Sequence, residues 1–258
     1  MVRYQIILAY DGSHFKGFQR QATARSVQGE LESVLRQLNW KGRTILAAGR
    51  TDTGVHATGQ VVAFDLDWSH PVAELQQAMN GLLPADIAVQ DIRPVKPDFH
   101  PRYHAAWRRY RYQIYCQPVR HPLLDRYAWQ VWPPAELPRL QDAASRLAGT
   151  HEYAAFGTPP RPESNTVRTV FQAGWWESAP HLILEITAQA FLYHMVRRLV
   201  HIQVLIGQGR LDTETLERSL DAPQDAPVRH GLAPAHGLAL VEVGYPPEVW
   251  SIDEVLEK

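Results

Sequence analysis

Apolar residues in the first hundred positions recur at the spacings of short strands and helices. Residues 2 to 10 predict a strand, because the apolar run at 6 to 8 ends at the turn signal Asp11-Gly12. Ser26 is a suitable N-cap, and the apolar residues that follow it at helical spacing are Val27, Leu31, Val34, Leu35 and Leu38. Beyond them the pattern predicts strands at 45–48, 61–64 and 86–93 and a helix at 73–80.

The second half of the chain has its own set of elements. We expect strands at 108–116, 167–176, 182–187 and 238–243, and helices at 137–147, 189–207 and 213–220, the last capped by Thr213. The helix at 189–207 has an apolar face formed by Phe191, Met195, Leu199, Ile202 and Ile206, and a second stripe formed by His194, Arg197 and His201. Strands and helices mix without strict alternation, which favours the α+β class. A proline-rich stretch before residue 102 places the domain boundary nearby, giving domains 1–104 and 105–258.

Composition narrows the class of protein. The chain has 258 residues, of which 45% are hydrophobic, so it can build the cores of two ordinary domains. Cys116 is the single cysteine, which excludes a disulfide within the chain and a zinc site made of thiolates. The N-terminal residues lack the pattern of a signal peptide, and no segment approaches the roughly 20 apolar residues of a membrane helix. We therefore expect a soluble, cytoplasmic protein.

The charge balance changes this picture little. A formal net charge of −1 argues against a surface that is basic all over, which counts mildly against nucleic-acid binding. A net charge near zero is compatible with a local basic patch, however. Most of the 26 basic residues are arginines, and arginine suits bidentate contact with phosphate and stacking on bases.

The segment with the clearest chemical potential is the loop around Asp52. Gly49 and Gly54 bracket it, and Arg50 precedes the carboxylate by two residues. Glycines let a second backbone or a ligand approach closely, and flanking strands would hold such a loop rigidly. Local sequence alone also fits a surface turn in which Asp52 caps its own backbone.

Residues 49 to 61, GRTDTGVHATGQV, resemble the signature of the tRNA pseudouridine synthase A (TruA) family. Further segments resemble that family over nearly the full length: YDG at 10–12, GFQRQ at 17–21, SVQGELE at 26–32, NGLLPADI at 80–87, FHPR at 99–102, RYRY at 109–112, FLYHMVR at 191–197 and APAHGL at 233–238. One departure is Pro101, which stands where alanine is usual. The resemblance implies an isomerase that converts uridine to pseudouridine.

The resemblance also implies roles for particular residues. Asp52 would be the catalytic nucleophile, and Arg197 would form an ion pair with it, since an opposite charge favours the ionised carboxylate that a nucleophile needs. Tyr110 would lie against the target base; Tyr112, on the same strand face, is its rival, and either tyrosine also fits a place in the core. The substrate-binding residues would be Arg50, Tyr110, Tyr112 and His194. Arg50 would help to hold a flipped nucleotide, although it also fits a role in which it only neutralises Asp52.

The fold implied by the resemblance has two RRM-like domains, each with a mainly antiparallel sheet flanked by helices, and a cleft between them. The implied substrate is the anticodon arm of tRNA at uridines 38, 39 and 40, and the implied assembly is a homodimer. No metal and no cofactor are expected, and the histidine pairs His100 with His104 and His194 with His201 lack a metalloenzyme spacing.

Two other functions remain open on the sequence. One is a non-catalytic RNA-binding or tRNA-folding module. The other is a hydrolase in which Asp52 and His56 act on water. For the isomerase itself, the sequence leaves open whether Asp52 attacks C6, attacks C1′ or removes the ribose 2′ proton.

Overall fold

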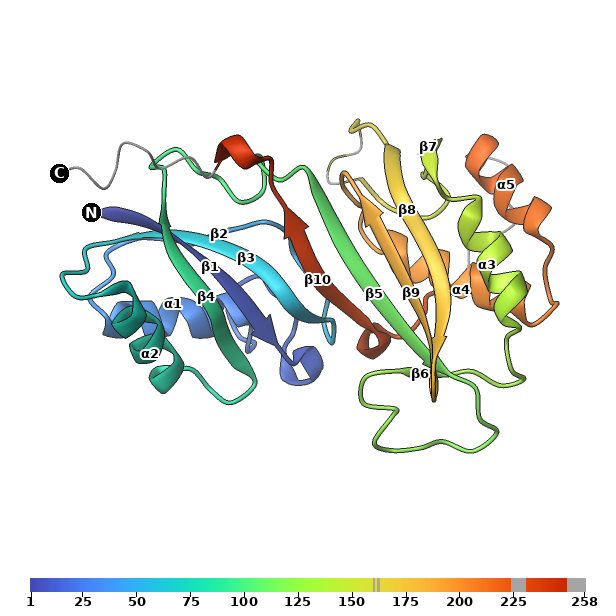
Figure 1. Ribbon diagram of the computed structural model, residues 1–258, viewed down its shortest axis with the longest axis horizontal. Coiled ribbons are helices and arrows are strands. Elements are labelled where there is room, and N and C mark those ends of the chain that lie inside the picture. Colours follow the sequence, from blue (N-terminus) through green and yellow to red (C-terminus); the bar gives the residue numbers. More distant parts are fainter. Residues whose placement is uncertain (160, 162, 224–230, 250–258) are drawn as a thin grey trace. The chain divides into compact units, whose positions relative to one another are not determined.

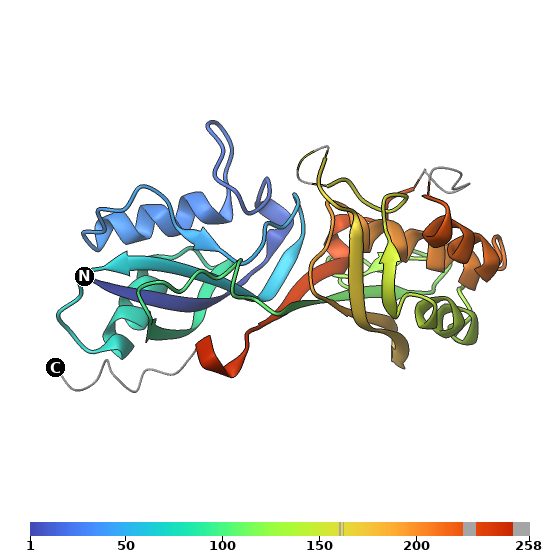
Figure 2. The same ribbon diagram turned by 90° about the horizontal axis from the view of Figure 1, so that it is seen from above.

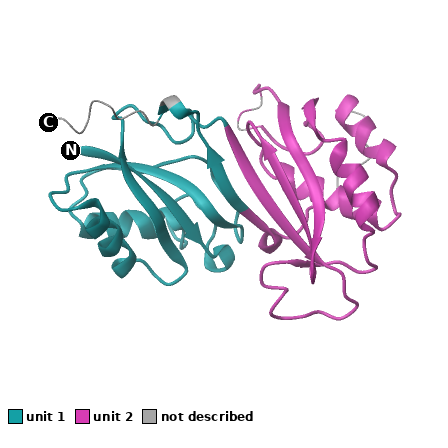
Figure 3. Ribbon diagram, in the orientation of Figure 1, with its two compact units in different colours: residues 1–106, 240–258 teal, residues 107–239 magenta. Residues whose placement is uncertain are grey.

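The computed structural model describes residues 1–159, 161, 163–223 and 231–249 (Figure 1). The chain groups into two compact units: unit 1 is Met1–Ala106 together with the residues from Leu240 onward, and unit 2 is Trp107–Ala239 (Figure 3). Strand β10 (Leu238–Gly244) lies between β3 and β5 in the sheet order. The expected domains, 1–104 and 105–258, stay a prediction.

Unit 1 interleaves strands and helices in the order of a split βαβ fold. Its elements are β1 (Val2–Tyr10), η1 (Gly12–His14), α1 (Val27–Gln37), β2 (Leu46–Ala47), β3 (His56–Leu66), α2 (Val72–Leu82), β4 (Ile87–Val95) and η4 (Pro247–Val249). The sheet order is β4-β1-β3, and both β2 and β10 also pair with β3. Strand β1 is antiparallel to both neighbours, with Ile6 opposite Val62 on one side and Ile92 on the other. Figure 2 shows α1 lying along this sheet.

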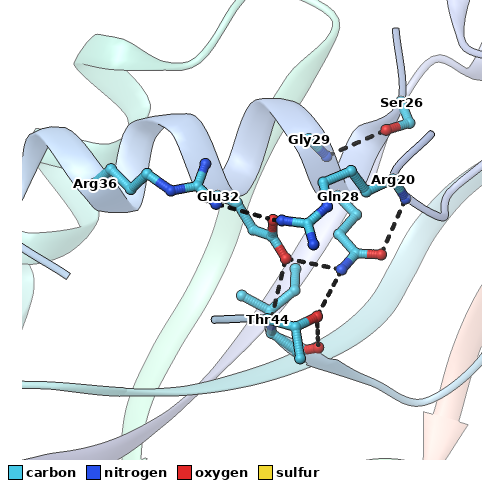
Figure 4. Close-up of polar contacts among 8 residues, drawn as sticks. Arg20, Ser26, Gln28, Gly29, Glu32, Arg36 and Thr44 are labelled. Atoms are coloured by element: carbon cyan, nitrogen blue, oxygen red, sulfur yellow. Dashed lines mark hydrogen bonds and ion pairs between the residues drawn. The ribbon is translucent and has the colours of Figure 1, made fainter. Parts of the chain in front are cut away.

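Helix α1 begins where the sequence predicts it and contains a buried carboxylate. Ser26 accepts a hydrogen bond from the Gly29 backbone N–H at 3.3 Å. Glu32 is 0% exposed, and its carboxylate accepts hydrogen bonds from Arg20 Nη1 at 2.6 Å and from the backbone N–H of Ile45 at 3.3 Å (Figure 4). A buried charge is tolerable when it is paired. Glu32 therefore ties the loop before α1 and the chain leading to β2 to the helix.

Unit 2 repeats the mixture of strands and helices. Its elements are β5 (Trp107–Tyr115), β6 (Trp129–Gln130), α3 (Leu137–Ser145), β7 (Gly149–Glu152), β8 (Val167–Ser178), β9 (His181–Ala188), α4 (Met195–Gly207), α5 (Thr213–Asp221) and η3 (Ala235–Gly237). The order β5-β9-β8-β7 is antiparallel throughout, whereas β6 runs parallel to β5. The expected α+β class with mainly antiparallel sheets is confirmed.

Four elements differ from the sequence prediction. Helix α4 begins at Met195 and not at 189, because His194 has a left-handed backbone (φ 66°) and Tyr193 forms a β-bridge with Thr158. Asp212 and not Thr213 caps α5. Strands β6 and β7 were not predicted, since runs of 2 and 4 residues are too short for a periodic pattern. In the described part of the chain, no helix is both long and apolar enough to cross a membrane.

Candidate active site

The loop between β2 and β3 carries Asp52, which is half-buried, and Arg50, which is exposed. Two backbone hydrogen bonds tie this loop to the segment that precedes α1: Phe18 N–H donates to Thr51 O at 3.1 Å, and Gly54 N–H donates to Phe15 O at 3.4 Å. A third bond closes the loop on itself, because Val55 N–H donates to the carbonyl of Asp52 at 3.1 Å. The structure therefore fixes the backbone on both sides of Asp52.

Two glycines, Gly12 and Gly17, allow the segment that precedes α1 to approach the loop of Asp52 closely. A Cβ atom on Gly12 would lie 2.1 Å from the carbonyl oxygen of Val55, so any other residue would have to displace backbone. Gly17 has φ +93°, and a Cβ there would lie 3.1 Å from the carbonyl oxygen of Thr51. Both positions belong to segments that resemble the family, but their local sequence does not reveal that they face the loop of Asp52.

Two buried polar side chains complete the support of the loop. The hydroxyl oxygens of Tyr10 and Thr51 are 2.7 Å apart, and Gln60 Nε2 donates to Gly49 O at 3.0 Å. Tyr10 lies at an irregularity in the pairing of β1 with β3, and such irregularities re-aim side chains. Burial raises the pKa of Tyr10 to about 12, so its hydroxyl stays protonated at neutral pH. Both residues belong to segments that resemble the family, but nothing in their local sequence distinguishes them from ordinary strand positions or predicts that they support the loop.

Tyr10→Phe is expected to lower both stability and turnover. The variant keeps the ring and removes one buried hydrogen bond, which costs about 1 kcal/mol of unfolding free energy. We also expect a lower kcat, because Thr51 directly precedes Asp52. Denaturant unfolding and single-turnover kinetics measure the two effects. Tyr4→Phe is the matched control, since Tyr4 is buried on the same strand away from the loop. Equal kcat values for the two variants would contradict the assigned role.

His56 follows the loop and is only 7% exposed. Its Nδ1 lies 2.9 Å from the backbone nitrogen of Gly12 and 3.2 Å from Oδ1 of Asp11. The ring thereby joins the start of β3 to the turn after β1. This structural use of His56 weighs against the hydrolase alternative, in which the histidine would act on water.

The two candidate tyrosines of β5 have different surroundings in unit 2. Tyr110 is half-buried, and its ring meets Phe191 edge-on, with centroids 5.1 Å apart and planes at 88°. Tyr112 is 0% exposed, and its hydroxyl donates to the carbonyl of Pro234 at 2.8 Å. The structure thus places Tyr112 in the core of unit 2, where its ring does not reach the surface.

Arg197 lies in the first turn of α4 and is half-buried; its Nε donates to the carbonyl of Ala233 at 2.7 Å. His194 precedes the helix, and its ring stacks on Tyr193 at 3.7 Å between centroids. His201 lies one turn after Arg197 in α4. Burial lowers the pKa of His201, so its ring is neutral at pH 7.

Asp52 belongs to unit 1 and Arg197 to unit 2. Their ion pair therefore stays a prediction.

The histidines of the other predicted pair bond to backbone. His100 Nδ1 accepts from Arg102 N–H at 3.1 Å, and His104 Nδ1 accepts from His100 N–H at 3.4 Å. Within the described ranges, no group of three or more His, Cys, Asp or Glu side chains is placed to hold a metal ion.

Comparison with known proteins identifies the family. The family model described as tRNA pseudouridine synthase matches residues 6–104 and 143–246. Proteins named tRNA pseudouridine synthase A are similar to this chain: one from Chloroflexus aurantiacus is 39% identical over 94% of this chain and 88% of its own length. Those from Halalkalibacterium halodurans and Moorella thermoacetica are both 40% identical, over 92% and 93% of this chain and 90% and 98% of their own lengths.

Among solved structures, the archaeal box H/ACA sRNP Nop10–Cbf5 complex is similar at 11% identity and a TM-score of 0.33, covering 80% of this chain and 54% of that chain. A likeness so distant carries no argument about this protein. The family model and the three relatives extend over most of the sequence, including the loop of Asp52 and the start of α4. The chain belongs to the tRNA pseudouridine synthase family.

Proposed function

We propose that this chain converts uridine to pseudouridine in the anticodon arm of tRNA, at positions 38, 39 and 40, and that it acts in the cytoplasm as a homodimer. The observation that carries the proposal is the similarity over more than nine-tenths of the chain to proteins named tRNA pseudouridine synthase A. The rigid support of the loop that contains Asp52 adds to it, since a catalytic group must be held in place before the substrate arrives.

The chemistry begins with a uridine that leaves the stack, because its reacting atoms are out of reach inside a helix. The carboxylate of Asp52 acts on this nucleotide, and the bond between N1 and C1′ breaks. The uracil turns within the site, and C5 forms the new bond to C1′. C5 then loses its proton and N1 gains one, so the product is an isomer of the substrate.

The surroundings of each residue support its role in this reaction. Asp52 is half-buried, which leaves part of the residue accessible to a nucleotide, and Arg197 would keep it ionised. Tyr110 is half-buried and held by Phe191, so its hydroxyl can take part in moving the C5 proton.

The surroundings of Arg50 and His194 fit contacts with RNA. Arg50 is exposed, as a residue that contacts phosphate must be. His194 stacks with Tyr193, which is 58% exposed, and together they offer an aromatic surface on which a base can stack. We assign no base contact to Tyr112, because its side chain is fully buried.

Release of tritium from 5-tritiated uridine tests the proposal. Incubating the purified chain with unmodified, labelled tRNA is expected to release label to water in proportion to the target uridines, because C5 loses its hydrogen. A tRNA with cytidine at positions 38 to 40 is the control and is expected to release none. Bound tRNA that keeps its label would indicate the non-catalytic RNA-binding module, and cleaved tRNA would indicate the hydrolase.

A further inference from the structure

We propose that Tyr112 is a positioning residue, which fixes the guanidinium of Arg197 by holding the segment from Ala233 to Gly237 against α4. This inference rests on the proposed function, in which Arg197 keeps Asp52 ionised. All of the contacts that carry it lie within unit 2.

Hydrogen bonds connect Tyr112 to Arg197 through two consecutive residues. The hydroxyl of Tyr112 donates to the carbonyl of Pro234 at 2.8 Å. The neighbouring residue Ala233 bonds Arg197 twice: its carbonyl accepts from Arg197 Nε at 2.7 Å, and its N–H donates to the Arg197 carbonyl at 3.2 Å. Tyr112 therefore holds the peptide that orients the arginine side chain.

Close packing keeps this segment in place. Tyr112 and Ala233 are both 0% exposed. A Cβ atom on Gly237 would lie 2.6 Å from Cζ of Tyr112, so the backbone there touches the tyrosine ring and only glycine permits the contact. Pro234, with φ −52°, has a backbone dihedral restrained by its ring. The hydroxyl of Tyr112 thus bonds a stiff segment that its own ring already supports.

The chemistry of both side chains suits this role. Burial raises the pKa of Tyr112 well above its usual value, so the hydroxyl keeps its proton and remains a donor. Arginine presents its donors in a planar fork, and the direction of the fork is set once Nε is bonded. When the hydroxyl is removed, Pro234 O loses the hydrogen bond from Tyr112, the segment loosens, and Ala233 no longer holds Nε in one direction.

Tyr112→Phe tests the inference, because it keeps the ring and removes only the hydroxyl. We expect kcat for tRNA to fall about ten- to a hundredfold, as for a small misplacement of a reacting group, while KM stays within about twofold. Tyr153→Phe is the matched control: Tyr153 is also fully buried in unit 2 and donates to the Leu147 carbonyl at 2.9 Å. Equal kcat values for Tyr112→Phe and Tyr153→Phe would overturn the positioning role.

A double-mutant cycle asks whether Tyr112 acts through Arg197. Lysine at 197 keeps a charge but lacks the guanidinium fork, so adding Tyr112→Phe to Arg197→Lys is expected to change kcat by less than about twofold. The full effect of Tyr112→Phe in that background would overturn the inference. If Tyr112→Phe is recovered unfolded, Gly237→Ala replaces it, because a Cβ at 237 would lie 2.6 Å from Cζ of Tyr112 and would push its hydroxyl away from Pro234 O. The same fall in kcat at constant KM is expected, and an unchanged kcat would contradict the role. A wild-type chain without tritium release would instead overturn the proposed function, and the inference with it.

Discussion

The Asp52→Asn variant is expected to lose tritium release from tRNA by a factor on the order of 10⁴ or more, the scale for removing a principal catalytic group. Asparagine has nearly the same size as aspartate but carries no negative charge, so it cannot serve as the nucleophile. We expect the variant to fold, because the hydrogen bond from Val55 N–H uses the backbone carbonyl of residue 52, which asparagine retains.

Two measurements accompany that result. Binding of tRNA by Asp52→Asn, measured by filter retention, is expected to stay near the wild-type value, which separates chemistry from recognition. Asp67→Asn is the control for loss of a carboxylate in unit 1, since the side chain of Asp67 is 96% exposed. Pseudouridine formation by Asp52→Asn at the rate of Asp67→Asn would refute the assignment of the nucleophile.

Replacing Arg197 with methionine is expected to lower kcat on the order of 10²–10³-fold, the scale for losing one preorganised electrostatic group. The change removes the positive charge proposed to keep Asp52 ionised, and it removes the donor to Ala233 O. Arg197→Lys is expected to recover part of this loss, because it restores the charge without the planar fork.

The neighbouring arginine provides the control for this series. Arg198 is also half-buried on α4, so Arg198→Met tests loss of an arginine from the same helix. Its kcat is expected to stay near the wild-type value in the tritium-release assay. A kcat for Arg197→Met that matches Arg198→Met would show that residue 197 has no special part in the reaction.

Local sequence determined most of the secondary structure and the family. Ser26 and the apolar residues after it begin α1 where predicted, since a cap and a helical spacing act over only a few neighbouring positions. The alternating pattern at 108–116 corresponds to β5 to within one residue. The loop with Asp52 was recognised for a similar reason, because its residues are consecutive in the chain.

Only the tertiary structure decided how those residues are supported. Tyr10 and Thr51 are 41 positions apart, and Tyr112 and Pro234 are 122 apart, so no local pattern records either contact. The start of α4 at Met195 depends on the bridge between Tyr193 and Thr158, which ends the extended chain there. Strand alternation places Tyr110 and Tyr112 on one face, yet Tyr112 is fully buried, in contact with Gly237 and bonded to Pro234, whereas Tyr110 is half-buried. Contacts between distant segments set burial and orientation, and these are properties of the folded chain.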